Sequence, residues 1–185
     1  MEYKICHAVK TQSSDEHVTK LITRFPKVFK KDLGLCTKTK VKLHLIPNAK
    51  PTYIQKRPVS YAALPKIDAE LRLEKLNIIE KTDFSLWAAP IVAVNKPNGK
   101  IRICADYSTG LNAALQPNKH PLPLPDDIFA KLAGKQYFTV IDFSDAYFQL
   151  AVEEESQELL TINTHRGLFK FKRLPFGVKS APGAF

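Results

Sequence analysis

The 185-residue sequence has few cysteines and no long apolar run. Its three cysteines, Cys6, Cys36 and Cys104, are odd in number and too widely spaced for a Cys-x-x-Cys pair. The sequence therefore predicts neither a zinc site nor a disulfide framework. Reduced thiols are typical of an intracellular protein, cytoplasmic or nuclear. No apolar stretch approaches the roughly 18 residues of a transmembrane helix, so no membrane association is expected.

Positive charge is in clear excess. The chain carries 28 Lys and Arg residues against 18 Asp and Glu residues, a formal net charge of +10. This excess favours a polyanionic partner, most plausibly nucleic acid. Hydrophobic residues make up 44% and charged residues 25%, which is typical of a globular chain rather than a disordered one. The length fits one domain, or part of a larger one.

The pattern of apolar residues predicts a mixture of helices and strands. Helical spacing predicts helices over 13–25, 62–76 and 126–133. In the second of these, Ile67, Leu71 and Leu76 are expected to face the core. Apolar runs predict strands over 41–46 and 136–143, and hairpins over 90–105 and 159–172. Because no βαβ rhythm is present, the predicted fold class is α+β with mainly antiparallel pairing.

Asp142 is a candidate for a chemical role. It follows an apolar run that reads as a buried strand, where a carboxylate is costly unless it is paired, hydrogen-bonded or bound to a metal. Carboxylate oxygens suit Mg²⁺. The alternative is a simple turn, in which Asp142 and Asp145 cap the next element, and spacing alone favours that alternative.

The first predicted hairpin is basic. It carries Lys96 and Lys100 at its tip and Arg102 on one strand. An Arg fork and Lys point charges are suited to closing on a triphosphate. An ordinary basic hairpin is the alternative, and without further context it is the better interpretation.

The second hairpin alternates basic and aromatic residues. Alternation sends Phe169 and Phe171 to one face and Lys170 and Lys172 to the other, with Arg173 directly after them. This arrangement suits a strand that follows a nucleic-acid backbone. It suits a half-buried sheet edge equally well.

Six motifs follow one another along the chain. They are Trp-Ala-Ala-Pro-Ile-Val at 87–92, Lys-Ile-Arg-Ile-Cys-Ala-Asp-Tyr at 100–107, His-Pro-Leu-Pro-Leu-Pro at 120–125, Val-Ile-Asp-Phe-Ser-Asp-Ala-Tyr-Phe-Gln at 140–149, Thr-Ile-Asn-Thr-His-Arg-Gly at 161–167 and Arg-Leu-Pro-Phe-Gly-Val-Lys-Ser-Ala-Pro at 173–182. In this order they resemble the reverse transcriptases of gypsy-like long-terminal-repeat retrotransposons. The resemblance implies the fingers and partial palm of a right-hand polymerase, with a mainly antiparallel sheet and packed helices. It implies a lead-in region over 1–50, made of a helix and a strand, and a fingers and palm region over 51–185.

The resemblance also implies roles for single residues. Asp142 matches the first of three metal-binding aspartates, and the backbone carbonyl of Phe143 would bind the same metal. Two Mg²⁺ ions are expected in the complete enzyme. Tyr147 matches the aromatic gate that excludes a 2′-hydroxyl by volume. The positions matching the nucleotide-binding residues of the family are Lys96, Arg102, Asp145, Ala146, Tyr147 and Gln149. Those expected near template and primer are Phe176, Gly177, Lys170, Lys172 and Arg173.

The sequence departs from the family where the other two aspartates are expected. The family carries them in a downstream Tyr-x-Asp-Asp hairpin, and no such motif occurs in these 185 residues. We therefore expect a fragment of an RNA-directed DNA polymerase that is inactive alone. The complete enzyme would transfer a nucleotide from a dNTP to a primer end on an RNA or DNA template. The other expected partners are the downstream thumb, ribonuclease H and integrase domains. The alternative is a non-catalytic, nucleic-acid-binding remnant of a retroelement.

Overall fold

The computed structural model describes residues 16–26, 28–29, 32–95, 101–117, 123–136, 138, 143 and 145–185. The chain divides into two compact units, Met1–Asp32 and Leu33–Phe185. The first unit contains helix α1 (Glu16–Arg24), in which Glu16 and Lys20 form an ion pair one turn apart, at 3.8 Å. The helix predicted over 13–25 is confirmed in its described part.

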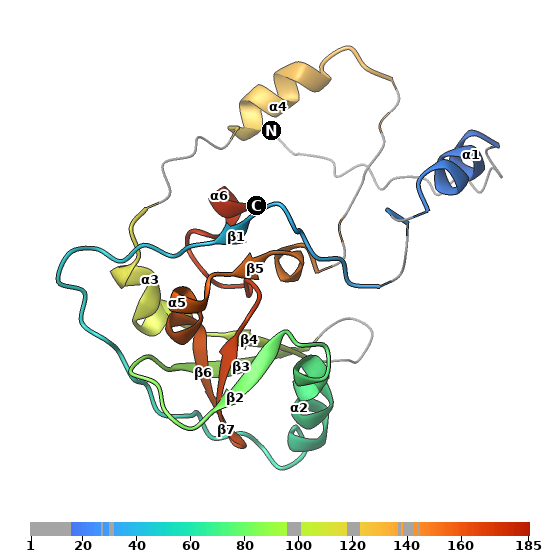
Figure 1. Ribbon diagram of the computed structural model, residues 1–185. Coiled ribbons are helices and arrows are strands. Elements are labelled where there is room, and N and C mark those ends of the chain that lie inside the picture. The colour runs from blue at the N-terminus through green and yellow to red at the C-terminus, as the bar shows by residue number, and fades with distance from the viewer. Residues whose placement is uncertain are drawn as a thin grey trace. The chain divides into compact units, whose positions relative to one another are not determined.

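The second unit is built on a five-stranded sheet (Figure 1). Its strands, in spatial order, are β2 (Ile79–Thr82), β7 (Gly167–Phe171), β6 (Thr161–Thr164), β3 (Ala89–Asn95) and β4 (Ile101–Ala105). All neighbouring strands are antiparallel except β3 and β6, where Ala89 pairs with Ile162 in parallel. The mainly antiparallel sheet predicted from the sequence is confirmed, as are both hairpins.

Short helical elements connect and cover the strands. The α-helices are α2 (Leu64–Glu70), α3 (Leu111–Ala114), α4 (Pro125–Leu132), α5 (Glu154–Gln157) and α6 (Ala181–Ala184). The 3₁₀ helices are η1 (Leu71–Glu74), η2 (Tyr107–Thr109), η3 (Ala146–Gln149) and η4 (Glu158–Leu160). A second, two-stranded parallel sheet joins β1 (Lys40–Val41) to β5 (Ala151–Val152). Across the described part of the chain, each helix is too short or too polar to cross a bilayer.

The helix predicted over 62–76 differs from the prediction at its end. The α-helix stops at Glu70 and tightens into η1, where each turn takes three residues rather than 3.6. Leu73, 8% exposed, therefore faces the core, whereas Leu76 is 51% exposed. The expectation that Leu76 points inward is wrong for this reason.

The strand predicted over 41–46 is shorter than expected, although its burial alternates as predicted. Val41 and Leu43 are buried and Leu45 is partly buried, whereas Lys42, His44 and Ile46 are exposed. The Leu43 N–H donates to the Ser156 hydroxyl at 3.0 Å instead of to a neighbouring strand, which ends regular pairing after β1. The strand predicted over 136–143 lies mostly outside the described residues.

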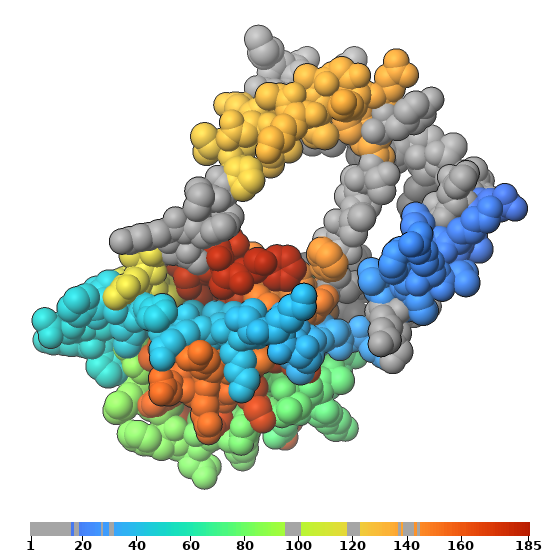
Figure 2. All heavy atoms as spheres, turned by 45° about the horizontal axis from the view of Figure 1, so that its top comes forward, coloured from blue at the N-terminus to red at the C-terminus, as the bar shows by residue number. Residues whose placement is uncertain are grey.

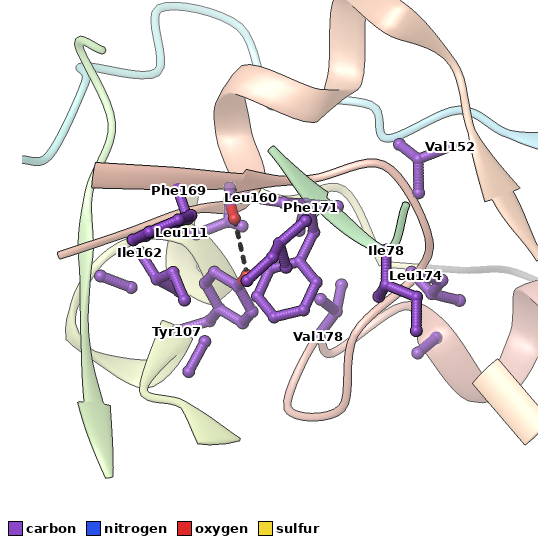
Figure 3. Close-up of a cluster of buried hydrophobic side chains, with 14 of the residues drawn as sticks. Ile78, Tyr107, Leu111, Val152, Leu160, Ile162, Phe169, Phe171, Leu174 and Val178 are labelled. Atoms are coloured by element: carbon purple, nitrogen blue, oxygen red, sulfur yellow. Dashed lines mark hydrogen bonds between the residues drawn. The ribbon is translucent and has the colours of Figure 1, made fainter. Parts of the chain in front are cut away.

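The core gathers Ile162 of β6, Phe169 and Phe171 of β7, and apolar side chains from the elements around this hairpin (Figure 3). Tyr107, only 1% exposed, lies among them, and its hydroxyl donates to the Leu160 carbonyl at 3.0 Å. Burial raises the pKa of Tyr107 well above its ordinary value. Phe169 and Phe171 point inward as the alternation of β7 predicts.

Residues 33–58 run across one face of the second unit as an extended segment, light blue to cyan in Figure 2. Backbone hydrogen bonds fasten this segment along its length. The Cys36 N–H donates to the Gln149 carbonyl at 2.7 Å, and the Ile54 N–H donates to the Ala88 carbonyl at 2.8 Å. The division at residue 50 stays a prediction.

Candidate functional site

A cluster of aromatic rings, here called the aromatic shelf, brings η3, the turn after β7 and the region of α6 together. The rings are those of Phe143, Tyr147, Phe148, Phe176 and Phe185. Tyr147 makes edge contacts to Phe176 at 5.2 Å and to Phe185 at 5.9 Å between ring centroids. Such edge-to-face pairs are each worth about 0.5–1.5 kcal/mol beyond area burial, so the rings hold one another in place.

Phe148 fixes the shelf to the core. It is 8% exposed and stacks on Phe171 of β7 with centroids 6.0 Å apart, while its other neighbour is Phe176 at 5.7 Å. Asp145 begins η3 with φ of +47°, in the left-handed region, and its carbonyl accepts the Phe148 N–H at 2.9 Å. Because residues in a 3₁₀ helix are spaced three to a turn, Tyr147 lies on a different side of η3 from Phe148.

Arg102 joins the shelf from β4. Its neighbours Ile101 and Ile103 are buried, and strand alternation sends Arg102 to the opposite, half-exposed side. Its guanidinium carbon lies 4.6 Å from the centroid of the Phe176 ring. A cation over an aromatic face at this distance is attracted by the ring quadrupole. The motif at 100–107 and the motif at 173–182, which are far apart in the sequence, are therefore in contact through Arg102 and Phe176.

The turn after β7 depends on Gly177. Its φ is +93°, and a Cβ at this position would lie 2.9 Å from the carbonyl oxygen of Ala105, at the end of β4. The turn is also held by Asn112 of α3, whose amide donates to the Gly177 carbonyl at 2.9 Å and accepts the Lys179 N–H at 2.8 Å. No sequence pattern predicts this role of Asn112, because a side-chain bond to distant backbone leaves no local signal.

Asp106 anchors the segment between β4 and α3. Its carboxylate accepts a hydrogen bond from the Ser108 hydroxyl and pairs with the Arg57 guanidinium. These interactions, that of Ser108 foremost, lower the pKa of Asp106. The Asp106 N–H donates to the Pro90 carbonyl at 2.9 Å. Neither Arg57 nor Asp106 was predicted from the sequence to have a role.

Lys170 and Lys172 lie beside Glu80, an acidic residue of β2. Their ammonium groups are 3.8 Å and 3.5 Å from the Glu80 carboxylate, and Lys172 also donates to the Asn77 side chain at 2.8 Å. Because β7 lies between β2 and β6, Lys170 is not on a sheet edge. Glu80 offsets part of their positive charge.

Arg173 contacts the backbone of the extended segment and of η3. Its guanidinium donates to the carbonyls of Gly34, at 2.9 Å, and Phe148, at 3.0 Å. Partial burial lowers the pKa of Arg173. This side chain connects the extended segment to η3.

The remaining predicted site residues are placed as follows. The Asp145 side chain is exposed, and Ala146 and Gln149 are half-buried in η3. Asp142 and Lys96 lie outside the described residues. Within the described ranges, no three His, Cys, Asp or Glu side chains come together as a metal site would require. The described part of the chain thus supplies no set of ligands for two Mg²⁺ ions.

Comparison with known proteins matches part of the chain to one family. Residues 94–185 match the family model described as reverse transcriptase (RNA-dependent DNA polymerase). Uncharacterized protein K02A2.6 of Caenorhabditis elegans is 49% identical over 164 residues, covering 87% of this chain and 13% of that protein. The retrovirus-related Pol polyprotein from transposon 412 of Drosophila melanogaster is 32% identical over 142 residues, covering 73% of this chain and 11% of the polyprotein. The chain thus spans a small part of the length of these relatives.

Solved structures show the same fold. The crystal structure of a mutant prototype foamy virus protease-reverse transcriptase superposes with a TM-score of 0.76 at 20% identity, covering 90% of this chain and 23% of that one. A foamy viral protease-reverse transcriptase in complex with an RNA/DNA hybrid gives a TM-score of 0.74 at 17% identity, with the same two coverages. The fingers and partial palm architecture expected from the sequence is confirmed.

Proposed function

We propose that the chain forms the nucleotide-binding front of a gypsy-like RNA-directed DNA polymerase. The match of residues 94–185 to the reverse transcriptase family model and the similarity to a retrovirus-related Pol polyprotein support this proposal. The observation that carries this proposal is the meeting of Arg102, Phe176 and Tyr147. These residues come from three separate motifs, and their side chains lie in direct contact through the Phe176 ring.

The contacts of Arg102 suit a residue that binds a triphosphate. The Phe176 ring holds the guanidinium on the half-exposed side of β4, and a guanidinium offers a planar fork of donors to phosphate oxygens. An arginine that is already oriented loses less side-chain freedom when it binds. We assign Arg102, Lys96 and the backbone N–H groups of Asp145 and Ala146 to the phosphates of the incoming dNTP.

Tyr147 is the proposed gate for the sugar. Phe176 and Phe185 both make edge contacts with its ring, which limits how far the ring can move away from a larger sugar. A 2′-hydroxyl would then be excluded by volume. Gln149, in the same 3₁₀ helix, and Phe176 with Gly177 are proposed to lie near the nucleotide and the template.

Asp142 and the Phe143 carbonyl stay the proposed Mg²⁺ ligands of this chain. Bound Mg²⁺ supplies charge stabilisation on transferring phosphates. The chain's own residues would orient the triphosphate and exclude ribose, as described above.

An RNA or DNA template-primer is the proposed macromolecular partner. The net charge of +10 favours it, and two of the similar foamy viral structures are complexes with double-stranded DNA and with an RNA/DNA hybrid. Arg173 is proposed to act on the template side through η3, since its guanidinium is engaged by backbone carbonyls. Lys170 and Lys172 are proposed as weaker phosphate contacts because Glu80 offsets their charge.

The gate is tested in a hybrid enzyme. An active reverse transcriptase has its front portion replaced by this chain, and kcat/KM is measured for dNTPs and rNTPs. Tyr147→Ala should raise the relative use of rNTPs, whereas Tyr147→Phe, which keeps the ring, should leave discrimination unchanged. Equal discrimination by the Ala variant and the parent would refute the assignment.

Primer-template binding by the chain alone and nucleotide addition by the hybrid together separate an enzyme from a binding protein. Residues 1–185 should bind a primer-template with an affinity that falls as salt is added, because binding releases counterions from the phosphates. Binding by this chain, together with a hybrid that binds primer-template and adds no nucleotide, would instead favour the non-catalytic binding protein.

A further inference from the structure

We propose that Asn112 is a positioning residue of the nucleotide site, because its side-chain amide fixes the turn that presents Phe176 to Arg102. The inference rests on the proposed function, since it concerns the same site.

Asn112 uses both ends of its amide on one turn. The Nδ2 group donates to the Gly177 carbonyl at 2.9 Å, and Oδ1 accepts the Lys179 N–H at 2.8 Å. The two bonds enclose Val178, whose side chain is buried in the core. A single amide therefore holds the chain on both sides of an anchored residue, which leaves the turn little freedom to rotate.

The opposite side of the turn is closed by β4. Gly177 approaches the Ala105 carbonyl so closely that a Cβ would lie 2.9 Å from that oxygen. The turn is thus confined between the end of β4 and α3. Phe176 is the residue directly before this confined position, so the orientation of its ring depends on both contacts.

Asn112 itself is carried by a well-fixed element. Leu111, directly before it, is buried, and Gly110 packs so closely on Thr52 that a Cβ would lie 2.7 Å from that side chain. Tyr107, in the preceding element η2, is buried in the core. A side chain on such a support can hold a turn in one position, whereas a loop residue would move with it.

The hydrogen bonds of Asn112 affect the nucleotide site through the ring of Phe176. Phe176 contacts Arg102 at 4.6 Å and Tyr147 at 5.2 Å. Releasing the turn would let the ring rotate, and the guanidinium would lose its aromatic partner. Asn112 acts through Phe176, so it is a positioning residue and not a catalytic one.

The test reads the environment of the Arg102 side chain by nuclear magnetic resonance on the full chain. The Nε–H proton of Arg102, assigned with Arg102→Lys, should show a ring-current shift from Phe176. Asn112→Ala should move this signal toward the position of an exposed arginine. Asn112→Asp, which keeps the acceptor for Lys179 and loses the donor to Gly177, should move it part of the way.

Gln116→Ala is the matched control. The Gln116 amide donates to the Leu45 carbonyl at 2.9 Å, which is the same type of bond in a different place. This variant should leave the Arg102 signal unchanged. An Arg102 signal that stays in place in Asn112→Asp, or in a folded Asn112→Ala, overturns the proposal. Fluorescence of Trp87, the one tryptophan, reports folding.

Titration of the chain–primer-template complex with dTTP gives a second readout. Loss of two hydrogen bonds to a preoriented turn should weaken binding about fivefold to tenfold in Asn112→Ala. Gln116→Ala should bind as the parent does, and equal affinity in all three proteins would contradict the positioning role. If the parent does not bind dTTP, the proposed function fails, while the Arg102 signal still decides whether Asn112 positions the ring.

Discussion

Replacement of Gly177 by alanine tests the close packing of the turn against β4. Two separate costs are expected. The φ of +93° is strained for any residue with a Cβ, and the added methyl group would lie 2.9 Å from the Ala105 carbonyl oxygen. That oxygen belongs to the backbone of a strand in the sheet, so it cannot move aside as the end of a flexible side chain would.

The expected loss of stability is the sum of the backbone strain and the overpacking. A strained backbone conformation costs about 1–3 kcal/mol. Overpacking against a fixed group costs a further 1–3 kcal/mol or so. Gly177→Ala should therefore lower the free energy of unfolding by about 2–6 kcal/mol, a large part of the roughly 5–15 kcal/mol that stabilises a typical domain.

Gly167→Ala is the matched control. Gly167 has a φ of +101°, and no described atom lies within 4 Å of the position a Cβ would take. This variant should suffer the backbone strain alone, about 1–3 kcal/mol. The difference between the two variants then measures the contact with Ala105.

The assay is urea unfolding followed by the fluorescence of Trp87, which is 5% exposed in the folded chain. Gly177→Ala should unfold at a clearly lower urea concentration than Gly167→Ala. Equal losses in the two variants would refute the close approach of the turn to β4. They would also remove one of the two supports of Phe176.

Three further changes should have measurable effects. Tyr107→Phe should lower the free energy of unfolding by about 1–3 kcal/mol at neutral pH, since the Leu160 carbonyl loses its donor. Because the folded pKa of Tyr107 is raised above 10.0, the parent should lose stability as pH rises past that value, and the Phe variant should lose less in the same titration. Ser108→Ala should reduce the stability that the lowered pKa of Asp106 provides above pH 3.8, and acid titration should then show a smaller loss than in the parent as pH falls below that value. Phe148→Ala should cost about 3–5 kcal/mol in urea unfolding, and a loss below 1 kcal/mol would show that the shelf is not fixed to the core.

The fold was predictable where local patterns determine it. Alternation in β7 and the turn at Gly167 gave the second hairpin, and the apolar runs on either side of 96–100 gave the first. Strand β2 was missed because its four residues show no clear alternation of apolar and polar side chains. In the structure, Ile79 is buried, Thr82 is partly buried, and the two residues between them are exposed. The parallel pairing of β3 with β6 was also missed, because it joins segments that are far apart in the chain.

The site was predictable to the extent that motifs mark it. The motif residues Arg102, Tyr147, Phe176 and Gly177 come together in the structure as one arrangement of contacts. The contacts that hold these residues in position could not be predicted from the sequence.

The contacts that support the site join side chains to distant backbone or to each other across the fold. Asn112 binds the turn at Gly177, and Arg57 pairs with Asp106. Neither pair has a spacing that repeats or a local composition that stands out. Such contacts follow from the tertiary structure alone.

RNA-templated primer extension by the hybrid enzyme tests the central claim most directly. The donor reverse transcriptase is active with its own front portion, so the measurement asks whether this chain can replace that portion. The hybrid should incorporate dNTPs opposite an RNA template, and Asp142→Asn should abolish the incorporation. A folded hybrid that binds primer-template and adds no nucleotide, or one that remains active with Asp142→Asn, would contradict the claim.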